Sequence, residues 1–201
     1  MVDRLVLIHD VNRRAKRAAY LRVRKNPEVA RQKEMRRRHR LRERLLIFYG
    51  TVCVLCGESD KAVLCIDHAN GGGNRDRANR SRGQTHRMIL KAADPDAYRT
   101  LCCNCNLREQ VSRAREARTN AEAAHYNDRY KLRALLRYGM TCVGCGETDA
   151  DCLTIHHVNG GGGQSRRVEG NKLCQWLWTN GYPEGYQTLC SNCNWRVYIA
   201  S

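Results

Sequence analysis

The sequence predicts an α+β protein in which two zinc-stabilised modules follow one another after a long basic helical arm. Three observations lead to this prediction. The chain repeats itself after 89 residues, each repeat contains two Cys-x-x-Cys pairs, and the first quarter of the chain is strongly basic. An internal repeat outweighs chain length as a guide to domain number, so the 201 residues are expected to form two small modules rather than one domain.

Residues 1–40 are predicted to form a basic helical arm. Residues 1–50 hold 16 lysines and arginines against 5 acidic residues, in a chain whose formal net charge is +16. Clustered positive charge of this size indicates a polyanionic partner, most often nucleic acid, and the alternative is a solvated surface. The helical pattern over residues 12–44 is interrupted at Asn26 and Pro27, because proline disfavours helix at the residue before it. With few apolar residues to bury, the arm is expected to become ordered on phosphates.

Module one covers residues 41–108. It opens with a helix that ends at Gly50, because glycine is favoured just past a helix end. Leu41, Leu45 and Phe48 recur at helical spacing and are expected to pack on the rest of the module. A short β-type run, "AVLCI", then leads to Asp67-His68 and a glycine-rich turn.

Residues 109–129 form a helical linker, and module two covers residues 130–201. Its first helix is expected to end at Gly139, and the run "CLTI" leads to His156-His157. Trp176 and Trp178 share helical spacing with two leucines. We expect them, like Trp195, to pack in a small core, and base stacking is the less favoured interpretation.

The cysteine pairs predict one structural zinc ion in each module. Four thiolates in two pairs match tetrahedral zinc. In modules of this size, a bound metal ion adds stability that the small hydrophobic core does not supply. Buried free thiols or disulfides are the less favoured alternatives, since no export signal precedes the repeats. The predicted ligands are Cys53, Cys56, Cys102 and Cys105 in module one, and Cys142, Cys145, Cys190 and Cys193 in module two. The cysteines without a counterpart in the other repeat are predicted to be small buried side chains: Cys65, Cys103, Cys152 and Cys174.

The residue pair after each β-type run suggests chemistry. A carboxylate beside an imidazole suits a division of labour in which Asp67 holds a divalent cation and His68 takes a proton from water. Such a pair can hydrolyse phosphodiesters, because the cation stabilises the charge that develops on the phosphate and the leaving oxygen. The alternative for His68 and His157 is a structural histidine beside a turn.

The segments "IDHANGGG" and "YRTLCCNCN", with their counterparts "IHHVNGGGG" and "GYQTLCSNCN", resemble the zinc-bearing, four-cysteine branch of the HNH endonucleases. That family has the ββα-metal fold, and the resemblance covers about residues 41–108 and 130–197. It implies a β-hairpin that carries the Asp-His or His-His pair and a following helix that presents an Asn to the metal. The implied catalytic residues are Asp67, His68 and Asn106 in module one, and His156, His157 and Asn194 in module two.

The chain departs from the family pattern at two places. Ala97 and Gly185 occupy the position where the family's middle Asn is expected, with Asn70, Asn74 and Asn159 as substitutes in the glycine turns. Glu109 and Val197 replace a basic residue that often follows the last metal ligand.

The function expected from this resemblance is that of a metal-dependent DNA endonuclease with one or both modules active. The cofactors are two structural zinc ions and catalytic Mg²⁺ or Mn²⁺. Asp67 and Asn106 offer oxygen ligands suited to magnesium, which favours module one, whereas His156 is softer and shifts the preference towards manganese, nickel or zinc. The alternative is a non-catalytic zinc-containing nucleic-acid-binding protein, associated with RNA or a ribosome.

DNA is the expected partner, RNA is the second choice, and a partner-binding zinc adaptor fits the charge less well. No apolar run reaches the roughly 18 residues of a membrane span, so no membrane partner is expected. The sequence therefore predicts a cytoplasmic protein, and the family resemblance implies a bacterial or phage-infected cell. Oligomeric state and target sequence are left open.

Overall fold

A computed structural model describes residues 26–117, 121–160 and 172–200. Residues 1–25 of the predicted arm, residues 118–120 of the linker and the glycines at 161–163 lie outside the described residues. The chain divides into two compact units. One combines the residues up to Phe48 with Asn74–Ala93, and the other combines Tyr49–Gly73 with Asp94–Ser201. The repeat boundaries stay a prediction, because these units divide the chain differently.

The first unit is helical and contains α2 (Pro27–Tyr49), up to Phe48, and α4 (Arg82–Ala92), preceded by α3 (Gly73–Asn79). The Oδ1 of Asn26 accepts hydrogen bonds from the N–H groups of Glu28 and Val29, at 3.1 and 3.3 Å. Asn26 therefore caps the helix, and Pro27 takes the first helical position, where its missing N–H costs nothing. A side chain at Gly83 would approach Arg37 to 3.1 Å, so α4 lies close against α2 at this glycine.

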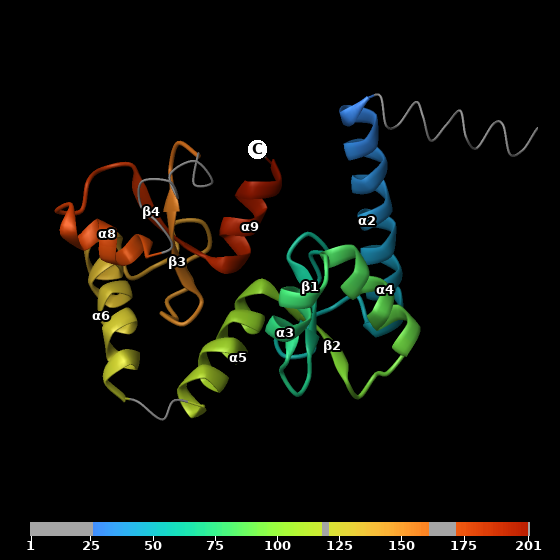
Figure 1. Ribbon diagram of the computed structural model, residues 1–201. Helices are drawn as coiled ribbons and strands as arrows, with labels where there is room; N and C mark the ends of the chain where they lie inside the picture. The colour runs from blue at the N-terminus through green and yellow to red at the C-terminus, as the bar shows by residue number, and fades with distance from the viewer. Residues whose placement is uncertain (1–25, 118–120, 161–171, 201) are drawn as a thin grey trace, which may run out of the picture. The chain divides into compact units, whose positions relative to one another are not determined.

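The second unit contains two antiparallel hairpins, each followed at once by a helix (Figure 1). In module one, β1 (Leu64–His68) pairs with β2 (Tyr98–Cys102), and α5 (Cys103–Glu116) follows. In module two, β3 (Leu153–His157) pairs with β4 (Tyr186–Cys190), and α9 (Ser191–Ala200) follows. The register is the same in both, with His68 opposite Tyr98 and His157 opposite Tyr186.

Two further helices belong to the second unit, α6 (Ala121–Tyr138) and α8 (Leu173–Thr179). The predicted linker, residues 109–129, comprises the end of α5, the start of α6 and the residues between them. The core of module two combines a leucine of α6 with residues of the hairpin and the knuckles, namely Leu135, Cys142, Cys152, Leu153, Leu189 and Cys190. Because two zinc-ligand candidates belong to this small core, metal binding and apolar packing stabilise the same region.

Both predicted helix ends are confirmed. Gly50 and Gly139 follow α2 and α6 with φ of +107° and +111°, a backbone conformation that glycine adopts without strain. A fully buried threonine in each hairpin binds this turn. The hydroxyl of Thr100 donates to the carbonyl of Gly50 at 2.9 Å, and that of Thr188 donates to the carbonyl of Gly139 at 2.6 Å.

For two residues, the prediction that they pack in the core is wrong. Leu45 and Leu46 are buried in α2, but Phe48 is 53% exposed. In α8, Leu177 is fully buried and Trp178 is 43% exposed. An α-helix turns by about 100° per residue. When the buried stripe is centred slightly away from the position predicted from the sequence, a residue at the edge of the predicted stripe is left in solvent.

The coarse fold prediction is confirmed: the described chain is a mixed α/β structure with small two-stranded sheets and two four-cysteine clusters. Among the described residues, no helix is long and apolar enough to cross a membrane.

Candidate functional site

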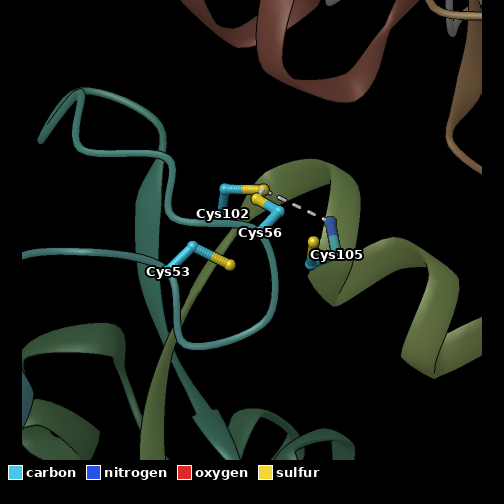
Figure 2. Close-up of side chains that lie close together, drawn as sticks. All are labelled: Cys53, Cys56, Cys102 and Cys105. Atoms are coloured by element: carbon cyan, nitrogen blue, oxygen red, sulfur yellow. Dashed lines mark hydrogen bonds between the residues drawn. The ribbon is translucent and has the colours of Figure 1, made fainter.

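The first four-cysteine cluster joins the loop before β1 to the end of the hairpin. Cys53 and Cys56 lie on that loop, Cys102 ends β2 and Cys105 lies in the first turn of α5 (Figure 2). All four Sγ atoms lie within 4.8 Å of one another, and those of Cys56 and Cys102 are 3.7 Å apart. Four thiolates around tetrahedral zinc have nearly this sulfur spacing, given a Zn–S distance of about 2.3 Å. The cluster therefore fits a structural zinc ion.

The second cluster repeats this geometry with Cys142, Cys145, Cys190 and Cys193. The Sγ atoms of Cys145 and Cys190 are also 3.7 Å apart, and the N–H of Cys193 donates to the Sγ of Cys190 at 3.4 Å. Burial raises the pKa of Cys142 and backbone N–H donors lower it, with a net fall to about 7. The same balance lowers the pKa of Cys53 to about 7. In each cluster one thiol therefore favours the thiolate, which is the form that binds zinc, whereas burial raises the pKa of Cys105 and of Cys193.

Of the four cysteines predicted to be small buried side chains, Cys152 is buried, and the other three are partly buried: Cys65, Cys103 and Cys174. The thiol of Cys65 donates to the carbonyl of Leu101 at 3.4 Å, and that of Cys103 donates to the carbonyl of Val63 at 3.1 Å. Burial raises the pKa of Cys65 and of Cys152 to about 12 in each case. These groups remain protonated at neutral pH and lie outside the two four-cysteine clusters.

In module one, the predicted metal ligand Asp67 faces arginines. It is 8% exposed, and its Oδ2 accepts from Arg99 at 3.4 Å and from Arg113 at 3.2 Å. Both guanidinium groups also bind Glu109, at 2.5 and 3.1 Å. Hydrogen bonding to Arg99, opposed by burial, holds the pKa of Glu109 below its usual range. Two arginines and two carboxylates therefore form a charge-balanced network around Asp67.

The other two predicted residues of module one have different neighbours. The side-chain amide of Asn106 donates to the Sγ of Cys65 at 2.9 Å, and its oxygen accepts from Gln110. The ring of His68 contacts that of Tyr98 edge to face, with centroids 4.9 Å apart. Within the described residues, no hydrogen bond joins Asp67 to Asn106.

Module two brings two of its predicted ligands together. The Nδ1 of His156 lies 2.9 Å from the Oδ1 of Asn194, and the amide of Asn194 donates to the hydroxyl of Thr154 at 3.1 Å. His156 comes from β3 and Asn194 from α9, so this contact links the hairpin to the helix after the second knuckle. The ring of His157 lies 4.8 Å from that of Tyr186.

The glycine turns hold the candidate substitutes for the missing Asn. Asn70 and Asn159 are both exposed, and the side chain of Asn74 lies outside the described set. A side chain at Gly73 would approach the Nδ1 of His68 to 3.0 Å, so a glycine at this position leaves room for the imidazole. No described contact of Asn70 or Asn159 braces either hairpin loop.

A reciprocal contact between the modules was not predicted. The N–H of Asn104 donates to the Oδ1 of Asn192 at 2.9 Å, and the N–H of Asn192 donates to the Oδ1 of Asn104 at 2.8 Å. Both side chains are buried, and each lies in the first turn of its helix, α5 or α9. Each asparagine thereby satisfies an N–H that has no partner within its own helix.

Ion pairs between the two modules are reciprocal in the same way. Arg108 of α5 binds Glu147 and Asp149 of module two at 2.7 and 2.5 Å. Arg196 of α9 binds the aligned Glu58 and Asp60 of module one, at 2.8 Å each. The signal was present in the sequence, because all these residues recur in both repeats, but a repeat does not reveal that its members bind each other.

Comparison with known proteins finds no matching family model, no matching curated sequence and no matching solved structure.

Proposed function

We propose that the protein is a metal-dependent DNA endonuclease of the HNH type, in which module two holds the catalytic cation. The contact between His156 and Asn194 is the observation that carries the proposal. In each module a hairpin, a zinc knuckle at its end and a helix follow in the order of the ββα-metal fold. The clustered positive charge supports DNA as the substrate.

The donor atoms in module two fit a divalent cation. An imidazole nitrogen and an amide oxygen that lie 2.9 Å apart can turn to the same ion, and water and a phosphate oxygen can complete its coordination. When bound, the cation would stabilise negative charge on the phosphate and on the leaving oxygen. With one nitrogen ligand, manganese suits this pair better than magnesium.

The residues of module two then have distinct tasks. His156 and Asn194 hold the cation, and His157 accepts a proton from the attacking water. Attack of that water on phosphorus breaks the bond to the 3′ oxygen. As the family resemblance implies, the products carry 5′-phosphate and 3′-hydroxyl ends. Tyr186, opposite His157 in the hairpin, packs against the imidazole and limits its rotation.

Module one is better suited to binding than to catalysis. The sequence favoured its oxygen ligands, but the oxygen of Asp67 already accepts from Arg99 and Arg113, and Asn106 is engaged by Cys65 and Gln110. We infer that module one serves as the clamp for a single active site in module two.

Plasmid nicking tests the proposal. Supercoiled DNA with manganese or magnesium should give nicked circles, which are lost with His157→Ala and with His156→Ala but persist with His68→Ala. The aligned His68 variant is the matched control, because it removes the same ring at the same hairpin position. Cleavage that is lost with His68→Ala but not with His157→Ala would place the active site in module one.

The alternative function is non-catalytic binding of DNA or structured RNA by a zinc protein. The charge-balanced network around Asp67 favours this alternative for module one. Tight binding to structured RNA without added divalent cation, together with no cleavage of DNA by the unaltered protein, would replace the nuclease by this alternative.

A further inference from the structure

Several described arginines of the second unit are neutralised by carboxylates of the protein itself. Those of β2, α5 and α9 that form ion pairs bind carboxylates at 2.5 to 3.4 Å: Arg99, Arg108, Arg113, Arg115 and Arg196. By its basic composition, the helix between the modules would be expected to supply affinity for nucleic acid. The ion-paired arginines of α5 are poorly placed for this task, because a phosphate would have to displace a carboxylate from each of them.

The arginines near the end of α6 differ. Among the residues that the structure describes, no carboxylate lies within ion-pair distance of Arg133 or Arg137. The two residues are four apart in the helix, so they lie on the same face, and Arg137 is exposed. Their charges are therefore available to a polyanion.

An exposed tryptophan lies beside this face. The guanidinium of Arg133 lies over the ring of Trp178, 4.0 Å from the ring centroid. Trp178 is 43% exposed. The rings of Tyr130 and Tyr182 support the indole from within the protein, at centroid distances of 6.2 and 6.3 Å. The exposed indole is thus held in place by its neighbours.

The backbone after α8 secures this arrangement. Tyr182 has a φ of +58°, which costs energy for a residue other than glycine, and its N–H donates to the carbonyl of Leu177 at 2.9 Å. The hydroxyl of Tyr138 donates to the carbonyl of Pro183 at 2.7 Å, which ties the end of α6 to the same turn. A strained turn that orients an aromatic ring against an exposed indole is the kind of feature that persists where a ligand binds.

We propose that Arg133, Arg137 and Trp178, here called the stacking surface, bind an unpaired segment of a DNA strand. A base stacks on the pair formed by the indole and the guanidinium of Arg133, and Arg137 binds a neighbouring phosphate. The inference rests on the proposed function only in taking DNA as the polyanion. It adds the substrate class: DNA with a single-stranded or opened segment, because base faces are accessible to side chains only where stacking in the duplex is interrupted.

Binding of the full-length protein to a labelled oligothymidine and to a duplex of equal length tests the proposal, by fluorescence anisotropy without added magnesium or manganese. Trp178→Ala should weaken binding of the single strand about 5- to 100-fold, the range for loss of one stacked base, and should affect the duplex much less. Trp178→Phe should restore part of the loss, since a ring remains. Trp195→Ala is the matched control, because Trp195 stacks on Tyr198 of its own helix.

The phosphate contact has its own control. Arg137→Ala should reduce the slope of log affinity against log salt by about one, as expected for one lost phosphate contact. Arg115→Ala removes the same charge from a guanidinium that already binds Asp151, and should leave the slope nearly unchanged. Zinc content and melting temperature of each variant establish that it is folded.

Equal weakening of single strand and duplex by Trp178→Ala, or no weakening at all, would overturn the stacking surface. The outcome is independent of the nuclease proposal, since no cleavage is measured. Selective loss of single-strand binding in a protein that never cuts DNA would retain this surface and remove the proposed catalysis. If Trp178→Ala binds DNA normally and His157→Ala abolishes nicking, the proposed catalysis is retained and the stacking surface is removed.

Discussion

The two modules share the arrangement of hairpin and following helix, and they differ in the side chains that lie between these two elements. Both have the same strand register, a zinc knuckle at the end of the hairpin, and a threonine bonded to the glycine turn. At the aligned position, module one places a carboxylate among arginines and module two places an imidazole against an amide. The duplicated framework therefore tolerates a change of chemistry at the residues it presents.

Charge balance explains the difference. Asp67 is almost fully buried and needs cations nearby, which Arg99 and Arg113 supply. At the positions aligned with Arg99 and Glu109, module two has Gln187 and Val197, and a histidine requires no fixed charge beside it. Each hairpin is consistent with its own surroundings, so exchanging one residue alone should not exchange the functions.

The largest expected effect tests what the modules share. Cys102→Ser or Cys190→Ser should reduce the zinc content from two ions per chain to one and unfold the affected module, because structural zinc contributes about 10 kcal/mol or more to such sites. Elemental analysis and circular dichroism measure the outcome. Cys103→Ser, next to the ligand but outside the cluster, should keep both ions. Two ions retained in Cys102→Ser would contradict the proposed ligand set.

A smaller effect should separate the modules. Asp67→Asn removes one of the two carboxylates that Arg99 and Arg113 share and leaves them with Glu109, so it should lower the free energy of unfolding by about 1–3 kcal/mol. His156→Gln removes a half-buried hydrogen bond to Asn194 and should cost about 0.5–1.5 kcal/mol. Urea unfolding of the metal-loaded chain measures both values. Equal costs would show that the arginine network does not depend on Asp67.

The smallest effect is the part of the acid sensitivity that comes from Glu109 of module one. The pKa of Glu109 is lowered in the folded state, so its ionised form stabilises the fold above the ordinary glutamate pKa of about 4.3. That contribution is lost as the pH falls through the lowered pKa. Since Glu109 is about one-third exposed, solvent screening limits the effect to under about 1 kcal/mol.

Glu109→Gln should remove this part of the pH dependence, measured as the difference in urea midpoint from the unaltered protein between about pH 3 and 6. Module two has Val197 at the aligned position and provides no counterpart of this titration. A difference in midpoint that is the same at every pH would show that the carboxylate does not contribute through its charge.

Local patterns were sufficient for the framework. The spacing of the cysteine pairs predicted both four-cysteine clusters, and Gly50 and Gly139 predicted where α2 and α6 end. Such predictions succeed because a helix end and each Cys-x-x-Cys pair depend on residue types at short sequence distances, and because the repeat shows which two pairs belong to one cluster. The same patterns placed Phe48 and Trp178 in the core, where helix rotation against its neighbours decides burial, and both are exposed.

By itself, the sequence determined that a four-cysteine repeat occurs twice, where its cysteine pairs lie and which residues occupy the hairpins. Only the tertiary structure decided that Asp67 meets Arg113, that Asn194 meets His156, and that Asn104 and Asn192 bind each other. These partners are separated by 38 to 88 residues. Contacts over such distances depend on how strands and helices pack, and neither the spacing nor the type of one residue specifies the partner.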